Sequence, residues 1–470
     1  MRIPSIVGAI SVTLLAAALG CGPKTVDPFK GEIPKCINLW PQGPRADTIS
    51  VALFDNVDPA HAPEWRNDSE RLVFRQLYET LPSDVTSPCS RPSRLADAPA
   101  SNGRSIVFTI RDDARFWDGS PVTSRDVAAS VGAPDDAFAD LDSVVVRDAR
   151  RVEVVAHSVD WSWLESSTRA VARPSGALWP MGTGPYRVDV NDDFADGAIV
   201  LEPVSGKLPV IRFIDARGRD PRDLLDGSSR FDIIATRDRT VIDYAGSLDR
   251  FGNVLLGQNR GYLLLSPDRA RAVERGDALA TLNYLQSSLA NDAVQAAYAQ
   301  SIPGREWSRA VGRCRATTAI PSTDTARSRR IVYDAKDSTA RDLADRIASL
   351  AASDVVLAKA VPGIAQTPSV MSVGLESADF AQSLAAGLDF AYVVGIRYEL
   401  PDLCRSIDEL VSAAPWLGGH DALLSDKALP LVKVTSLAFI ARPTDGYGFE
   451  ISLDRYFRAK IVEPDLTPYP

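Results

Sequence analysis

The sequence is poor in the residue types that build catalytic and metal sites. Only three histidines occur among 470 residues, and His61, His157 and His420 lie far apart, so no HExxH or comparable ligand spacing exists. No GxSxG, GxGxxG or phosphate-loop motif is present either, because Gly182 to Gly184 lead into Pro185 rather than into a helix. The sequence therefore predicts a protein that is not an enzyme and that needs neither a metal nor a cofactor. A hydrolase is the weakest alternative.

Net positive charge and long apolar runs are also missing. The formal net charge is −9, and it becomes −10 (−9 − 1) once a leader containing Arg2 is removed, which argues against nucleic acid and anionic membrane surfaces as partners. Beyond residue 20 no run is long and apolar enough to cross a membrane. The hydrophobic fraction of 45% and the charged fraction of 24% are ordinary for a globular protein, and the length indicates more than one domain.

The N-terminus has the pattern of an export signal. Arg2 precedes an apolar run from Ile6 to Leu19 that is too short for a transmembrane helix. It ends in ALGC at residues 18–21, which resembles the lipobox of bacterial lipoproteins and predicts lipid attachment at Cys21. Ala18 stands where leucine is commonest, so ordinary signal cleavage is the alternative. The proline-rich residues 21–46 then read as a tether.

The stretch FTIRDDARFWDGSPVTSRDV, at Phe108 to Val127, is the most informative in the chain. Residues 106–110 are β-branched or aromatic and predict a strand, and Asp118-Gly119 predicts a tight turn. Thr123 and Asp126 have capping-box spacing, so a helix is expected to begin near Ser124 and to stop at Gly132. These residues predict a scaffold rather than a ligand site.

This stretch and the motif GTGPY at Gly182 to Tyr186 resemble the extracellular solute-binding proteins of family 5, the peptide and nickel class that serves ABC importers. DPA at Asp58 to Ala60 and LYETL at Leu77 to Leu81 match more weakly, in the order that the family uses. The resemblance implies a two-lobed periplasmic binding protein-like α/β fold (class C, type II) with mixed sheets, helices and a β-rich inserted subdomain in lobe one.

The order of the predicted elements also indicates two lobes. Residues 47–256 are rich in short strands and form lobe one, with the inserted subdomain at about 60–190. Residues 257–429 alternate strands and helices and form lobe two. Residues 430–470 are β-like and return to lobe one, so the chain crosses between the lobes more than once. Such crossings act as hinges, and the cleft between the lobes is the expected pocket.

Four cysteines remain after Cys21. The pairs Cys36 with Cys89 and Cys314 with Cys404 are favoured, because each would lie within one lobe of an exported protein. Zinc binding is the alternative, although the spacing of these cysteines is not typical of zinc ligands.

The resemblance also suggests which residues contact a ligand. Peptide-binding members carry a "G-W-x-x-D" loop whose backbone pairs with the ligand and whose aspartate holds its amino group. The corresponding run here is GIRYELPD, Gly395 to Asp402, in which Gly395 matches the glycine, Ile396 replaces the tryptophan and Glu399 takes the acidic position. Arg397 adds a positive charge to this loop, and Tyr398 completes the candidate set. The alternative is that Glu399 and Asp402 are loop acids exposed to water.

Trp65 is a further candidate, since aromatic side chains near clefts often anchor ligands, but a tryptophan is as often part of a core. The expected function is that of a periplasmic or cell-surface lipoprotein, a monomer, which captures a peptide or similar small polar solute for an ABC permease. The alternative function is a degenerate binding fold that acts in envelope interactions or sensing.

Overall fold

The computed structural model describes most of the chain beyond the predicted leader and tether. The described residues are 47–81, 93–97, 100–133, 141–157, 161–165, 167–188, 197–204, 208–226, 231–236, 238–248, 252–267, 299–314, 328, 330–353, 371–398, 400–425, 427–441, 450–453 and 459–462. Cys21, Cys36, Cys89 and Glu399 lie outside them, as do the predicted leader and tether. In the described part of the chain no helix has the length and apolarity needed to span a membrane.

Lobe one is a sheet between two layers of helix. Its strands are β1 (Thr48–Leu53), β6 (Tyr186–Val188), β7 (Ala198–Pro203), β8 (Val210–Asp215) and β9 (Ile233–Thr236), and its helices are α1 (Asp68–Leu77), α3 (Pro221–Asp226) and α4 (Arg239–Gly246). Neighbouring side chains of a strand point to opposite faces, so Val51 packs in the cluster with α1 while Ala52 packs with α3 and α4. Both faces of the sheet are therefore buried.

The inserted subdomain contains a separate antiparallel sheet, and it is smaller than the predicted range of about 60–190, because α1 and β6 of that range pack in the core of lobe one. Its strands, in the spatial order β2-β3-β5-β4, are β2 (Ala100–Asn102), β3 (Ser105–Thr109), β5 (Arg151–Ala156) and β4 (Leu141–Val146). Helix α2 (Ser124–Val131) packs against this sheet, and Thr123 and Asp126 form the predicted capping box at its start. The predicted helix stop at Gly132 is confirmed, because Gly132 is the C-cap. Lobe one also contains a short 3-10 turn before α1, at Pro59–His61 (η1). The subdomain contains two such turns after β5, at Ser162–Glu165 (η2) and Ser167–Arg169 (η3).

Lobe two is also built in layers. Its strands are β11 (Ala299–Ser301), β12 (Arg330–Asp334), β13 (Met371–Leu375) and β14 (Ala391–Arg397). Its helices are α7 (Gly304–Val311), α8 (Ser338–Ser353), α10 (Ser377–Ala386) and α11 (Leu400–Ala413). Its 3-10 turns are η4 (Pro415–Leu417) and η5 (His420–Leu424). Helix α8 packs on one face of the sheet, and α7 and α11 pack on the other. A disulfide joins Cys314, just beyond α7, to Cys404 in α11, with the Cα atoms 5.1 Å apart. This is the pairing that the sequence favoured.

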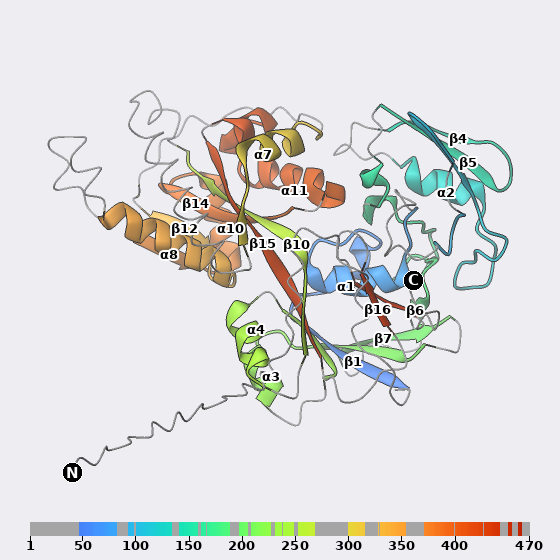
Figure 1. Cartoon of the computed structure of the whole chain (residues 1–470), viewed down its shortest axis with the longest axis horizontal. Coiled ribbons are helices and arrows are strands. Elements are labelled where there is room, and N and C mark those ends of the chain that lie inside the picture. Colours follow the sequence, from blue (N-terminus) through green and yellow to red (C-terminus); the bar gives the residue numbers. More distant parts are fainter. Residues whose placement is uncertain are drawn as a thin grey trace, which may run out of the picture.

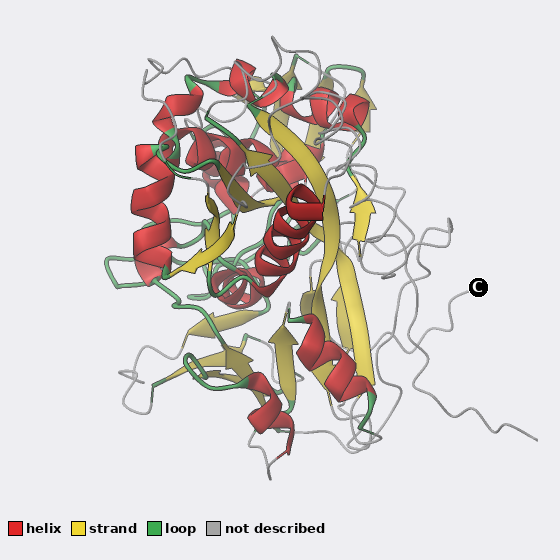
Figure 2. Cartoon of the chain, turned by 90° about the vertical axis from the view of Figure 1, so that its left-hand side faces the viewer, coloured by secondary structure: helices red, strands yellow, loops and turns green. Residues whose placement is uncertain are grey.

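Two long antiparallel strands connect the lobes. Strands β10 (Gly252–Leu265) and β15 (Ala428–Ala441) run diagonally between the two lobes in Figure 1 and along the length of the molecule in Figure 2. One end of β15 pairs with β9 of lobe one, while the other half of β10 pairs with β14 of lobe two. A single eleven-stranded sheet thus passes through both lobes. The predicted lobe boundaries, at residues 256/257 and 429/430, fall inside these two strands.

The C-terminal hairpin lies against lobe one. Its strands are β16 (Glu450–Leu453) and β17 (Ala459–Val462), and β17 contacts α1.

Candidate functional site

A buried glutamate shapes the loop through which lobe one contacts lobe two. Glu70, in the first turn of α1, is only 1% exposed. Its carboxylate accepts hydrogen bonds from the backbone N–H groups of Asp58 (3.2 Å) and Arg66 (2.6 Å), and it lies 2.6 Å from Nδ1 of His61. These bonds fix the loop of residues 58–66, so Trp65 is held at a defined position facing lobe two.

Trp65 bonds directly to lobe two. Its indole Nε1–H donates to Oδ2 of Asp402 in α11 at 3.2 Å, and both side chains are 1% exposed. Its carbonyl oxygen accepts a hydrogen bond from Nη1 of Arg397 at 2.7 Å. Trp65 therefore joins the lobes and belongs to the buried interior, which agrees with the core alternative for this residue.

Arg397 and Arg405 complete the contact from the side of lobe two. Arg397 pairs with Glu409 at 2.6 Å and donates to the hydroxyl of Ser406 at 3.2 Å. Arg405 pairs with Glu409 at 3.2 Å and also with Glu64 of lobe one. The two guanidinium groups thus place α11 against the loop that carries Trp65.

Asp402 has one carboxylate oxygen without a partner. Oδ2 accepts the indole N–H of Trp65, whereas Oδ1 is buried and has no hydrogen-bond partner among the described residues. Leaving a buried acceptor unsatisfied costs about 1–3 kcal/mol, and more for a charged group. The alternative hypothesis, that Asp402 is a loop acid exposed to water, is wrong, because α11 and the Trp65 loop bury this residue between the lobes.

The backbone at Gly395 lies against an arginine. Gly395 in β14 pairs with Tyr262 in β10, and a Cβ atom on Gly395 would come within 2.4 Å of Nε of Arg260. A side chain at position 395 would therefore displace this guanidinium from its place on the backbone. Arg260 also pairs with Asp337 at 3.0 Å, and Asp337 accepts the hydroxyl hydrogen of Tyr262.

The charge of Arg260 is stabilised from both lobes. Burial alone lowers the pKa of its guanidinium, but Tyr262, Asp337 of lobe two, and Asp68 and Asp55 of lobe one raise it, and the net direction is upward. A permanently charged guanidinium therefore stands between acids of the two lobes, at the strand that the sequence predicted to contact a ligand.

Tyr398 is held within lobe two. Its hydroxyl donates to Glu306 at 3.3 Å, its ring stacks on Trp307, and the Lys433 ammonium lies 5.8 Å from the ring centre. Burial, followed by the negative charge of Glu306, raises the pKa of Tyr398. These contacts with lobe two therefore hold the segment after β14 in place.

The structure thus brings Gly395, Arg397 and Trp65 to one interface between the lobes. The sequence did not single out Arg260 as a site residue, and it offered no motif that could have done so. The described residues contain no group of three or more histidine, cysteine, aspartate or glutamate side chains placed to hold a metal ion.

Solved structures with the same arrangement of elements are solute-binding proteins. The substrate-binding protein CtaP of an ABC transporter from Listeria monocytogenes is 12% identical, with a TM-score of 0.58 over 89% of this chain and 100% of that chain. NikA from Brucella suis in complex with Fe(III)-EDTA is 13% identical, with a TM-score of 0.56 over 88% of this chain and 99% of that chain. The chain has the two-lobed fold of the periplasmic binding proteins. The predicted fold class is confirmed.

A third similar structure contains a peptide. The periplasmic binding protein DppA from Helicobacter pylori, in complex with the peptide STSA, is 11% identical, with a TM-score of 0.55 over 89% of this chain and 99% of that chain. No family model matches the sequence, and no curated protein sequence matches it. The likeness therefore lies in the fold. The similar solved proteins named here are binding proteins rather than enzymes.

Proposed function

We propose that this chain is a substrate-binding protein of an ABC importer, a divergent member of the peptide and nickel class, that captures a small polar solute between its lobes. The observation that carries the proposal is the buried oxygen of Asp402 at the lobe interface, which has no hydrogen-bond partner among the residues that the structure describes. An ammonium group of a ligand would satisfy this oxygen with a charge-assisted hydrogen bond.

The same interface offers a group for the opposite charge. Arg260 lies on the backbone of Gly395 and carries a charge that acids of both lobes stabilise. A guanidinium binds carboxylates in a forked geometry, so the interface suits a solute with an amino and a carboxylate group, such as a short peptide. Delivery to a permease, attachment through a lipid on Cys21 and a place outside the cytoplasm belong to this proposal.

The alternative is a binding fold that has become an envelope interaction protein. The observation that favours it is the set of direct bonds between the lobes, from Trp65 to Asp402 and from Arg405 to Glu64, since these groups already satisfy one another in part. In that case the partner is a protein rather than a solute.

Mass spectrometry of the protein purified under native conditions distinguishes the two functions. We expect a bound small solute that is released on unfolding, together with at least a tenfold lower affinity for that solute in Asp402→Asn. The matched control is Asp421→Asn, which changes an exposed acid of the same lobe. Protein that carries no solute, and whose melting temperature no peptide mixture raises, would support the interaction protein instead.

A further inference from the structure

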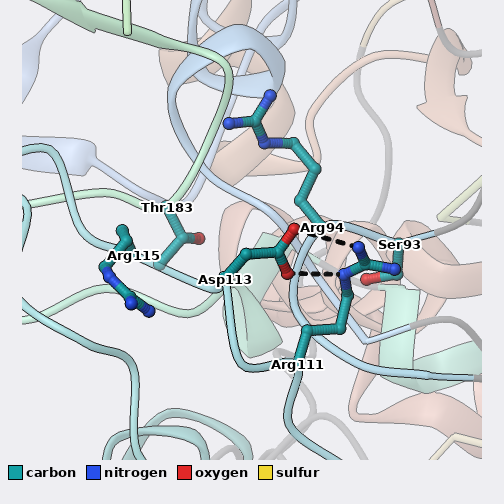
Figure 3. Close-up of a pocket in the computed structure, with 6 residues that line it drawn as sticks. All are labelled: Ser93, Arg94, Arg111, Asp113, Arg115 and Thr183. Carbon is teal, nitrogen blue, oxygen red and sulfur yellow. Dashed lines mark hydrogen bonds and ion pairs between the residues drawn. The ribbon is translucent and has the colours of Figure 1, made fainter. Parts of the chain in front are cut away.

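A polar cavity lies in lobe one, away from the strands that connect the lobes. Its volume is about 250 Å³, and it lies where the residues before β2, the loop between β3 and α2, and the GTGPY motif meet (Figure 3). Its lining consists of Ser93, Arg94, Arg111, Asp113, Arg115 and Thr183. Three arginines thus face one carboxylate.

One arginine of the cavity is neutralised. Arg111 donates to both oxygens of Asp113, at 2.9 and 3.0 Å, and the two side chains lie together in Figure 3. The hydrogen bond from Arg111 lowers the pKa of Asp113, so this acid stays ionised at neutral pH. Asp97 is a more distant partner of the same arginine, at 3.9 Å.

The other two arginines have no carboxylate partner in the described part of the chain. The guanidinium of Arg94 makes no hydrogen bond or ion pair with a described residue, and in Figure 3 it extends away from the Arg111–Asp113 pair. Within the described part of the chain, Arg115 donates only to the carbonyl oxygens of Asp112 (2.6 Å) and Ala114 (2.9 Å). The carboxylate of buried Glu79 accepts the backbone N–H of Arg94 at 3.2 Å, and the backbone N–H of Glu79 donates to the Thr183 hydroxyl at 3.4 Å. Two guanidinium groups of the lining are therefore without a direct bond to a carboxylate among the described residues, while Asp113 interacts with Arg94 through its charge alone.

A hydroxyl group adds a donor to this charge. The Ser93 oxygen accepts the backbone N–H groups of Leu95 (3.1 Å) and Ala96 (3.4 Å), which leaves its hydrogen without an acceptor among the described residues. The Thr183 hydroxyl, in contrast, donates to the carbonyl oxygen of Val171. The cavity thus presents N–H and O–H donors that an oxyanion would satisfy.

We propose that this cavity is a second binding site, which holds the oxyanion of a small metabolite, a phosphate or a di- or tricarboxylate, between Arg94, Arg115 and Ser93. Its volume of about 250 Å³ is large enough for a single small anion. All six lining residues belong to lobe one, so the site needs no closure of the lobes. It goes beyond the proposed capture of a solute between the lobes.

Calorimetric titration of the purified chain tests this site. Inorganic phosphate and citrate are the two probes, each added at constant ionic strength, and they separate the phosphate from the carboxylate class. We expect saturable binding of at least one probe with one site per chain, and at least a tenfold weaker affinity in Arg94→Ala and in Arg115→Ala. Arg115→Lys keeps the charge and should retain more of the affinity than Arg115→Ala. Arg94→Ala removes no described bond of the protein, so its fold should persist, and the melting temperature without anion checks this.

The matched control is the double variant Arg104→Ala/Arg219→Ala, which removes two exposed positive charges elsewhere in lobe one. We expect it to bind the probe as the natural chain does. Equal losses in the control and cavity variants, or no saturable binding of either probe, would overturn the site. Native mass spectrometry of the same preparations reports separately on a solute between the lobes. Failure of the anion site and failure of the proposed function can therefore be distinguished.

Discussion

At the scale of single residues, Gly395 decides what can lie on the backbone of β14. An alanine there would place Cβ 2.4 Å from Nε of Arg260, which must then leave its position and its ion pair with Asp337. We expect Gly395→Ala to lower the free energy of unfolding by about 1–3 kcal/mol in urea denaturation. In an Arg260→Ala background the same change should cost less, because no guanidinium remains to be displaced.

Gly304→Ala is the matched control for this substitution. A Cβ on Gly304, at the start of α7, meets no atom within 4 Å, so its effect should stay within roughly 1 kcal/mol and can be stabilising. An equal cost of Gly395→Ala with and without Arg260 would contradict the close contact between these two residues.

The bond between Trp65 and Asp402 should couple the lobes energetically. Trp65→Phe removes the indole N–H and leaves both oxygens of the buried Asp402 without a described partner, at a cost of about 1–3 kcal/mol. In Asp402→Asn the amide can present its own donor and acceptor, so adding Trp65→Phe should then cost less. A double-mutant cycle by urea unfolding measures this difference, and strict additivity would show that the bond has no energetic role.

Sequence reasoning located part of this interface and missed the rest for physical reasons. Gly395 and Arg397 were predicted because they lie in a contiguous run that resembles a family motif. Arg260 lies in another strand, and only the pairing of β10 with β14 brings it to Gly395. An exposed loop acid is one of the two alternatives that the sequence leaves for Asp402, whereas packing between α11 and the Trp65 loop buries it. Burial by a distant segment leaves no local signal.

At the scale of elements, the GTGPY motif is explained by close backbone packing. A Cβ on Gly182 would come within 2.2 Å of the carbonyl oxygen of Leu77 at the end of α1 and within 2.5 Å of the Trp117 ring. The end of α1 is fixed by its backbone, and the backbone N–H of Trp117 donates to the carbonyl oxygen of Gly182. Moving either group away from a new Cβ therefore costs free energy. We expect Gly182→Ala to destabilise the protein by about 3 kcal/mol or more, or to abolish soluble expression, as measured by thermal unfolding.

This prediction separates a scaffold role of the motif from a ligand role. Protein of Gly182→Ala that can be recovered folded should bind solute as the natural chain does, because none of its described contacts involves the interface between the lobes. Normal stability together with lost solute binding would mean that the motif contacts the ligand.

Local signals predicted elements well where chemistry within a few residues determines the conformation. The capping box of Thr123 and Asp126 starts α2, and the β-branched and aromatic residues predicted as a strand at 106–110 correspond to β3 at Ser105–Thr109. The length of strand β10 comes from its partner, because its first half pairs with β15 beside lobe one. The bend and register shifts near Gln258 and Tyr262 depend on that partner, so no local pattern of the sequence could give them.

At the scale of the whole molecule, the two long strands and the contacts between the lobes predict a movement. Strands β10 and β15 are the described connections between the lobes, and their pairing is irregular at Gln258 and Tyr262, where an antiparallel ribbon bends most easily. A binding protein uses such a hinge to close on its solute, and the closed state is then populated according to the bonds that only closure forms. Here these bonds include the ion pair of Arg405 with Glu64 and the indole bond of Trp65 to Asp402.

Weakening these bonds should therefore open the molecule and lower its affinity together. In the double variant Glu64→Gln/Trp65→Phe, stripped of solute by unfolding and refolding, we expect a larger radius of gyration in small-angle X-ray scattering than in the natural chain treated alike. Adding a tripeptide mixture should shrink both proteins, but the variant should need a higher concentration, because part of the binding free energy goes into closing the lobes. Asp223→Asn/Asp421→Asn, which alters two exposed acids outside the contact between the lobes, is the control and should scatter as the natural chain does. If the two proteins scatter identically with and without peptides, the lobes are locked, and the chain acts as a rigid interaction protein rather than as a clamp for a solute.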